Sequence, residues 1–142
     1  MNYVFIVPLR PVAKGRPRFT RTGHAYTPKA TADYEQAVAA YARRAMAEIG
    51  EKKATGAVHV WLTFYYAPPK SWTKAQQQKC AEAGALPKTT KPDVDNLVKA
   101  VLDGMNGIVF EDDNQITGIY ATKAWSYDRA DSVSIGIFDG EK

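Results

Sequence analysis

The chain has 142 residues and a mass of 15.7 kDa, which suits one domain around a single hydrophobic core. Hydrophobic residues make up 45% and charged residues 24%, so the composition is globular rather than disordered or fibrous. One cysteine and two histidines are too few for a disulfide framework or a zinc site. No apolar run reaches the ~20 residues of a membrane helix, and no signal peptide is recognisable, so we expect a cytoplasmic protein.

Charge is distributed unevenly along the sequence. The net charge is +4, but residues 1–92 contain 15 Lys or Arg against 5 Asp or Glu, whereas residues 93–142 contain 4 against 10. Charged runs are often only solvated surface. Here the basic part predicts a polyanionic partner, and the position of the acids, described below, predicts a local chemical role for them.

The hydrophobic pattern predicts four elements in the first half of the chain. Residues 3–7 form an apolar run that a proline stops, which indicates a strand. Residues 10–29 contain six Lys or Arg and no acid, interrupted by glycines and prolines, which is typical of a loop or ribbon. Residues 31–49 carry apolar side chains at helical spacing, and residues 57–66 alternate as a strand.

The second half continues this alternation of helices and strands. A capping-box sequence at Thr73 predicts a short helix. A further helix, capped by Asp95 or Asn96, is expected to end near Asn106. Two strands complete the chain, at residues 115–127 and 133–138. We therefore predict one small domain spanning residues 1–142, of the α/β (α+β) class, with a mixed β-sheet flanked by helices.

The segment richest in chemistry is KPDVDNLVKAVLDGMNGIVFEDDNQI, which begins at Lys91. Asp95, Lys99 and Asp103 recur every four residues on one side of the predicted helix, opposite an apolar stripe. Six acids and one lysine lie within residues 93–113. Clustered carboxylates repel each other unless a cation lies among them, and oxygen donors suit Mg²⁺ or Mn²⁺. The segment therefore predicts metal-assisted hydrolysis of a phosphodiester.

Each of these features also has a structural explanation. Asp95 as a helix cap contributes only about 1 kcal/mol, and Lys99 between two aspartates can form weak ion pairs on a wet face. Asp112 and Asp113 suit a turn. The conjunction of all these features in one window favours the metal site. For two further acids we expect structural roles: Asp103 and Glu111.

The same segment resembles the RusA family of Holliday-junction resolvases, which are small Mg²⁺-dependent endonucleases common in phages and prophages. Its pattern of Asp-x-Asp-Asn-Leu-x-Lys, followed by Asp-Asp-x-Gln-Ile/Val, matches residues 93–99 and 112–116. The connecting stretch matches too, with Gly104 where the family more often has alanine. Two further segments look like phage members of the family: residues 14–19 and 69–72.

The resemblance implies a role for each matching residue. It implies that Asp93, Asp95 and Asp113 bind the metal, with Asp112 in a supporting place, and that Lys99 is a catalytic lysine. It also implies Mg²⁺ as the cofactor, with Mn²⁺ as a substitute. A homodimer with two active sites facing a four-way DNA junction is implied as well, and two symmetric incisions suit a twofold dimer.

The basic residues are expected to follow DNA phosphates, which gives affinity but little sequence information. These residues are Lys14, Arg16, Arg18, Arg21, Lys88 and Lys91, with Arg10 and Lys29 as further candidates. Phe19, His24 and Tyr26 are weaker candidates for stacking on bases. The alternative is that these aromatic side chains pack against the protein's own loop.

Three classes of function remain open, with an enzyme ahead. The first hypothesis is a Mg²⁺-dependent, structure-selective endonuclease that resolves Holliday junctions by paired phosphodiester hydrolysis in DNA recombination and repair. A related version acts on flaps or forks. The second is a non-catalytic branched-DNA-binding module with a structural cation. Lys99 favours the enzyme, because a structural cation site does not need an adjacent lysine. A protein-interaction domain ranks last, since it leaves the basic segment unexplained.

Overall fold

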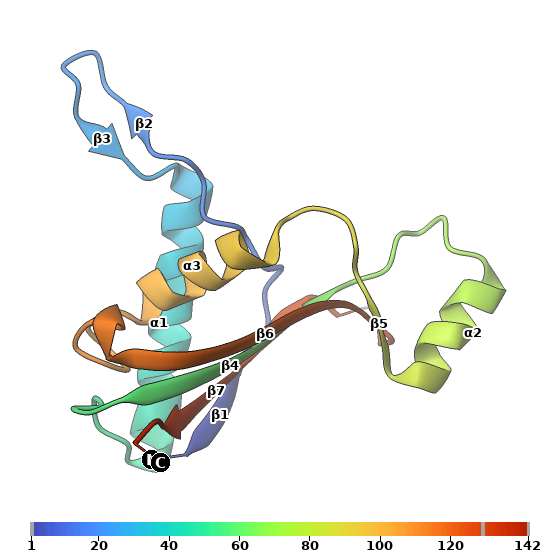
Figure 1. Ribbon diagram of the computed structural model, residues 1–142. Coiled ribbons are helices and arrows are strands. Elements are labelled where there is room, and N and C mark those ends of the chain that lie inside the picture. The colour runs from blue at the N-terminus through green and yellow to red at the C-terminus, as the bar shows by residue number, and fades with distance from the viewer. Residues whose placement is uncertain (1, 129, 142) are drawn as a thin grey trace.

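The computed structural model describes residues 2–128 and 130–141. A five-stranded sheet carries helices α1 and α3 on one face, while a two-stranded hairpin extends away from it (Figure 1). The elements are β1 (Tyr3–Val7), β2 (Arg18–Phe19), β3 (Ala25–Tyr26), α1 (Lys29–Ile49), β4 (Val58–Tyr66), α2 (Lys74–Ala83), β5 (Ala85–Pro87), α3 (Val94–Met105), the 3₁₀ turn η1 (Asp113–Gln115), β6 (Ile116–Ser126) and β7 (Ser132–Asp139).

The sheet is mixed, as predicted. Its strand order is β1-β7-β4-β6-β5. Strand β4 pairs in parallel with β6 and antiparallel with β7, and the two outer pairs, β1 with β7 and β5 with β6, are antiparallel. The predicted α+β class is confirmed, and the basic segment 10–29 contains the hairpin β2–β3.

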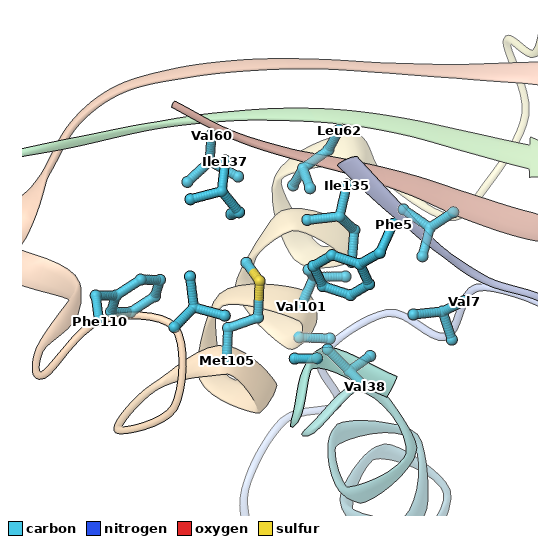
Figure 2. Close-up of a cluster of buried hydrophobic side chains, with 14 of the residues drawn as sticks. Phe5, Val7, Val38, Val60, Leu62, Val101, Met105, Phe110, Ile135 and Ile137 are labelled. Carbon is cyan, nitrogen blue, oxygen red and sulfur yellow. The ribbon is translucent and has the colours of Figure 1, made fainter. Parts of the chain in front are cut away.

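The core lies between the sheet and the two helices. Alternate residues of β4 are buried, as its sequence pattern predicted, and they face the apolar stripe of α3. Figure 2 shows Val60 and Leu62 of the sheet gathered with Val101 and Met105 of α3. Because one side of α3 is held in this core, its opposite side is presented to solvent in a fixed orientation.

Gly104 explains how closely α1 and α3 approach. A Cβ atom at this position would lie 2.9 Å from the Glu35 carbonyl oxygen and 2.9 Å from Cβ of Val38, both on α1. Glycine at this position therefore allows α1 and α3 to pack closely, whereas the methyl group of an alanine would force the two helices to move apart.

The predicted caps of α3 at Asp95 or Asn96 are wrong. The helix begins at Val94, with Asp93 in the N-cap position and Asp95 inside the first turn. Asp93 is extended (φ −71°, ψ 141°), and its side chain makes no capping hydrogen bond. A proline precedes Asp93, and the helix begins as soon as the chain leaves that extended stretch. The other predicted cap, at Thr73, is confirmed with its full capping box.

Among the helices of residues 2–128 and 130–141, none has the length and apolar character needed to cross a membrane.

Candidate active site

Helix α3 presents a line of charged side chains to solvent. Asp95 and Lys99 are exposed, and the Asp103 side chain retains 30% of its accessible surface. Among the described residues, Lys99 forms no ion pair. The ion pairs that Lys99 could have formed with Asp95 and Asp103 on the helix surface are therefore absent. The Lys99 ammonium group is free to act on a ligand.

Two lysines hold the loop that leads into α3. The Lys88 Nζ atom donates to the Thr90 carbonyl oxygen at 3.3 Å, to its Oγ1 atom at 2.6 Å and to the Lys91 carbonyl oxygen. From β6, the Lys123 Nζ atom donates to the Thr90 carbonyl oxygen and, at 2.6 Å, to that of Pro92. These bonds fix the backbone immediately before Asp93.

Lys88 is enclosed rather than open to DNA. Only 6% of its surface is accessible, and its Nζ atom lies 5.0 Å from the Tyr66 ring centre and 4.7 Å from that of Trp125. Burial, with the positive charges of Lys123 and Arg10, lowers its pKa. The structure thus gives Lys88 an internal role, which differs from the expectation that it follows phosphates.

The turn carrying Asp112 and Asp113 is tied down by one glutamine. The Gln115 Oε1 atom accepts from the backbone N–H groups of Glu111 at 2.7 Å and Asp112 at 3.0 Å. Its Nε2 atom donates to the carbonyl oxygens of Ala54 and Gly56, each at 3.0 Å. Gln115 and Lys123 are positioning residues that sequence reasoning did not single out. For Gln115 the capping-box spacing from Asp112 was an available signal.

The charged side chains of α3 act on Asp113 of this turn. A hydrogen bond with the Asp112 side chain raises the pKa of Asp113, and loss of hydration and the negative charge of Asp112 add to this. The Asp103 carboxylate raises the same pKa further, whereas the Lys99 ammonium lowers it. Asp113 therefore lies within electrostatic range of the middle of α3. The crowded negative charge of Asp112 and Asp113 is the kind that a bound cation relieves.

The donors fit a hard divalent cation in their chemistry, because all of them are carboxylate oxygens. Their arrangement is less complete. Within residues 2–128 and 130–141, no three His, Cys, Asp or Glu side chains lie close enough together to hold a metal ion. The predicted ligands thus form two groups. Asp112 and Asp113 are in contact, while Asp93 and Asp95 lie at the start of α3.

The two acids expected to be structural form ion pairs. The Asp103 Oδ2 atom lies 3.0 Å from Lys14 Nζ, which also contacts Glu35 of α1 at 2.8 Å. The Glu111 Oε2 atom lies 3.1 Å from Lys53 Nζ. Burial lowers the pKa of Lys14, but its bonds to Glu35 and Asp103 outweigh this and raise it overall. Lys14, expected to bind DNA, is thus used to join the two helices.

The remaining predicted DNA contacts are accessible. Arg16, Arg18, Arg21 and Lys91 are exposed, and none of them forms an ion pair with another described residue. In contrast, Arg10 pairs with Asp131 at 3.3 Å and Lys29 with Asp33 at 2.7 Å.

An acidic face with an adjacent free lysine, beside an exposed basic hairpin, is the combination expected of a nuclease. Comparison with known proteins supplies the family. The endodeoxyribonuclease RusA family matches residues 8–137 of the chain. The uncharacterized protein YqaN of Bacillus subtilis (strain 168) is 38% identical over 126 residues, which cover 86% of this chain and 87% of YqaN. The protein belongs to the RusA family of endodeoxyribonucleases.

Family membership makes the chain an endodeoxyribonuclease, a hydrolase of DNA phosphodiester bonds. Nucleases of this family depend in general on a divalent metal ion. The resemblance detected in the sequence is confirmed, together with the fold class that it implied.

Proposed function

We propose that the protein is a Mg²⁺-dependent, structure-selective endonuclease that resolves Holliday junctions by paired phosphodiester hydrolysis during recombination and repair. The observation that carries this proposal is that Asp113, hydrogen-bonded with Asp112, lies within electrostatic range of Lys99 and Asp103 on α3, in a chain of the RusA family. Carboxylates and a lysine so arranged suit attack on a phosphate more than they suit binding alone.

In this proposal Asp112 and Asp113, with Asp93 and Asp95, hold Mg²⁺, which Mn²⁺ can replace. The ion, when bound, supplies Lewis-acid stabilisation of a phosphoryl oxygen and a more acidic water. Lys99 offers an ammonium group to the negative charge that develops on the phosphate.

The support of these groups matters as much as their identity. Gln115 holds the Asp112–Asp113 turn, while Lys88 and Lys123 hold the backbone before Asp93. Catalysis needs side chains kept within about 0.5 Å of their working positions. The hydrogen bonds at both ends of the site limit the movement of the backbone that carries the carboxylates, while the carboxylate side chains themselves can turn toward an ion.

We further propose that the active form is a homodimer. A four-way junction has near-twofold symmetry, and two symmetric nicks require two equivalent active sites, which a C2 dimer provides. The exposed arginines Arg16, Arg18 and Arg21, together with Lys91, are the proposed phosphate contacts.

The test is cleavage of a labelled synthetic four-way junction beside matched linear duplex, flap and fork DNA, with Mg²⁺ and then with EDTA. We expect paired symmetric nicks in the junction that disappear in EDTA and are weak on the controls. The Asp95→Asn variant should bind the junction and fail to cut it. Binding without cutting at any Mg²⁺ or Mn²⁺ concentration would instead identify a branched-DNA-binding module. Preferential cutting of flaps or forks would retain the chemistry and replace the substrate.

A further inference from the structure

The hairpin β2–β3 places two large aromatic side chains in solvent. Phe19 is 69% exposed and Tyr26 is 48% exposed, and the hairpin extends beyond the end of α1, away from the sheet (Figure 1). The alternative in which Phe19 packs against its own loop is therefore wrong. What distinguishes these two rings from other exposed aromatic side chains is that they lie within the basic, acid-free segment 10–29, so a role in binding a polyanion is the better explanation.

The strand register puts the two rings on opposite faces of the hairpin. Arg18 pairs with Tyr26, and Phe19 pairs with Ala25. Paired residues share a face of the hairpin, and neighbouring residues of a strand point to opposite faces. Phe19 and Tyr26 therefore project from opposite faces, and the two-stranded hairpin offers an aromatic side chain on each of them.

The charges around the rings suit a polyanion. Residues 10–29 contain no acid, and Arg16, Arg18 and Arg21 form no ion pair with any residue in the described ranges. Arginine combines phosphate binding with stacking on flat surfaces. The hairpin therefore carries positive charge beside its aromatic surfaces, which is the combination that binds exposed bases and their backbone.

The segment that leads into the hairpin, Lys14 and Gly15, is hydrogen-bonded to the helices beside the candidate active site. The Lys14 backbone N–H donates to the Asn96 carbonyl oxygen at 2.9 Å, one residue from Asp95. Its Nζ atom contacts Asp103 on the same helix, and the Gly15 N–H donates to Thr31 Oγ1 on α1 at 3.1 Å. The hairpin therefore starts from a fixed position relative to the charged line of α3.

We propose that this hairpin enters the branch point of DNA, where Phe19 and Tyr26 stack on bases that lack a stacked neighbour while the three arginines bind the flanking phosphates. This inference rests on the proposed function and extends it, since it assigns the element that recognises and opens the branch. Bases at a branch point have exposed faces, whereas those within a continuous duplex are covered by their neighbours on both sides.

The experiment uses a four-way junction with 2-aminopurine at the branch point and a second junction with the probe inside one arm. Binding is measured in EDTA so that no cutting occurs. We expect the full-length protein to lower the branch-point fluorescence, because an aromatic ring then covers the exposed face of the probe base, and to leave the arm probe unchanged. Phe19→Ala should abolish the fall in fluorescence and weaken binding by about tenfold, and Phe19→Trp should keep both the fall and the affinity. Tyr127→Ala, which removes an aromatic side chain that is 60% exposed on the domain body, is the matched control and should behave as wild type.

Two results would overturn the inference. One is an unchanged branch-point signal when the wild-type protein is bound to the junction. The other is a Phe19→Ala variant that keeps both the fall in fluorescence and the affinity. If the wild-type protein still cuts junctions in Mg²⁺, either result removes the hairpin's role and leaves the proposed function standing. If it neither binds nor cuts the junction, the proposed function and this inference fail together.

Discussion

The charged face of α3 and the hairpin β2–β3 both lie open to solvent, but they rest on different supports. Helix α3 has Leu97, Val101 and Met105 fully buried beneath its exposed line, while both residues of β2 and both of β3 are exposed. A two-stranded hairpin alone is only marginally stable. The rigid helix thus holds proposed metal ligands and the lysine, which need accurate positions, and the lightly supported hairpin holds the proposed DNA contacts, which have to adapt to their ligand.

The basic residues divide in the same way. Lys14, Lys88 and Lys123 donate to carboxylates or carbonyl oxygens of the protein, whereas Arg16 and Arg18 have no ion pair among the described residues. A net positive charge in the sequence therefore overstates the number of groups that DNA can reach. The following predictions separate the internal cations from the external ones.

The largest expected effect separates cutting from binding. Asp113→Asn should lower junction cleavage by about 100-fold or more, because a proposed metal ligand is lost. Junction binding should be retained or should tighten, since a carboxylate that repels phosphate is removed. Single-turnover cleavage and gel-shift binding measure the two effects. Asp33→Asn, an exposed carboxylate on α1, is the control. Equal losses in both variants would remove Asp113 from the site.

Lys14→Met should destabilise the fold, because it leaves Glu35 and Asp103 without their common partner. The three side chains are 17%, 17% and 30% exposed, so we expect the free energy of unfolding to fall by about 2 to 3 kcal/mol. The matched control is Lys29→Met, whose ion pair with Asp33 joins side chains that are 88% and 57% exposed, so that water screens the pair and its loss should leave the free energy of unfolding almost unchanged. Urea denaturation measures both. Similar losses would contradict the internal role of Lys14.

Lys88→Met should impair the metal dependence of cleavage more than DNA binding. The variant removes the donor to the Thr90 and Lys91 carbonyl oxygens while keeping an apolar side chain between two aromatic rings. Residues that support a metal ligand typically change metal affinity by about 10- to 100-fold, so the Mg²⁺ concentration for half-maximal cleavage should rise within that range. Lys79→Met, on the exposed side of α2, should leave it unchanged. An unaltered Mg²⁺ dependence in Lys88→Met would show that the loop does not need this anchor.

Arg18→Ala tests the external cations. Because Arg18 is exposed and has no ion pair among the described residues, the free energy of unfolding should change by less than about 0.5 kcal/mol. Junction affinity should fall, and the slope of log K against log salt should decrease by about 0.9 for the lost phosphate contact. Arg44→Ala, on the exposed side of α1, is the control. A salt slope equal to that of wild type would remove Arg18 from the DNA surface.

The smallest effect is a pH dependence of the internal ion pair. The pKa of Lys14 is raised above its ordinary value of 10.5 in the folded state. Its stabilising contribution is therefore complete below the unfolded pKa and is lost as the pH rises through the folded pKa. The stability difference between wild type and Lys14→Met should stay constant between pH 7 and 9 and shrink above the ordinary lysine pKa. A difference independent of pH throughout would assign the effect of Lys14 to packing.

Several elements could be predicted because their signals are local. The apolar spacing of α3 and the alternation along β4 follow from helix and strand periodicity, and both agree with the structure. The helix cap was misplaced because the sequence around Asp93 and Asp95 offers several capping residues. Only the path of the chain after Pro92 selects among them.

The chemical composition of the site was readable from the sequence by itself, since the Asp-x-Asp-Asn-Leu-x-Lys and Asp-Asp-x-Gln-Ile patterns are contiguous and specific. They identified the family and the acidic segment, and the Lys and Arg content of residues 10–29 identified the basic one. Tertiary structure alone decided which cations remain available. Lys14 and Arg16 are two residues apart, yet one ammonium group meets carboxylates from two helices while the neighbouring guanidinium group faces solvent. That outcome depends on contacts between residues distant in the chain, such as Lys14 with Asp103 and Lys88 with the rings of Tyr66 and Trp125, which short-range patterns do not encode.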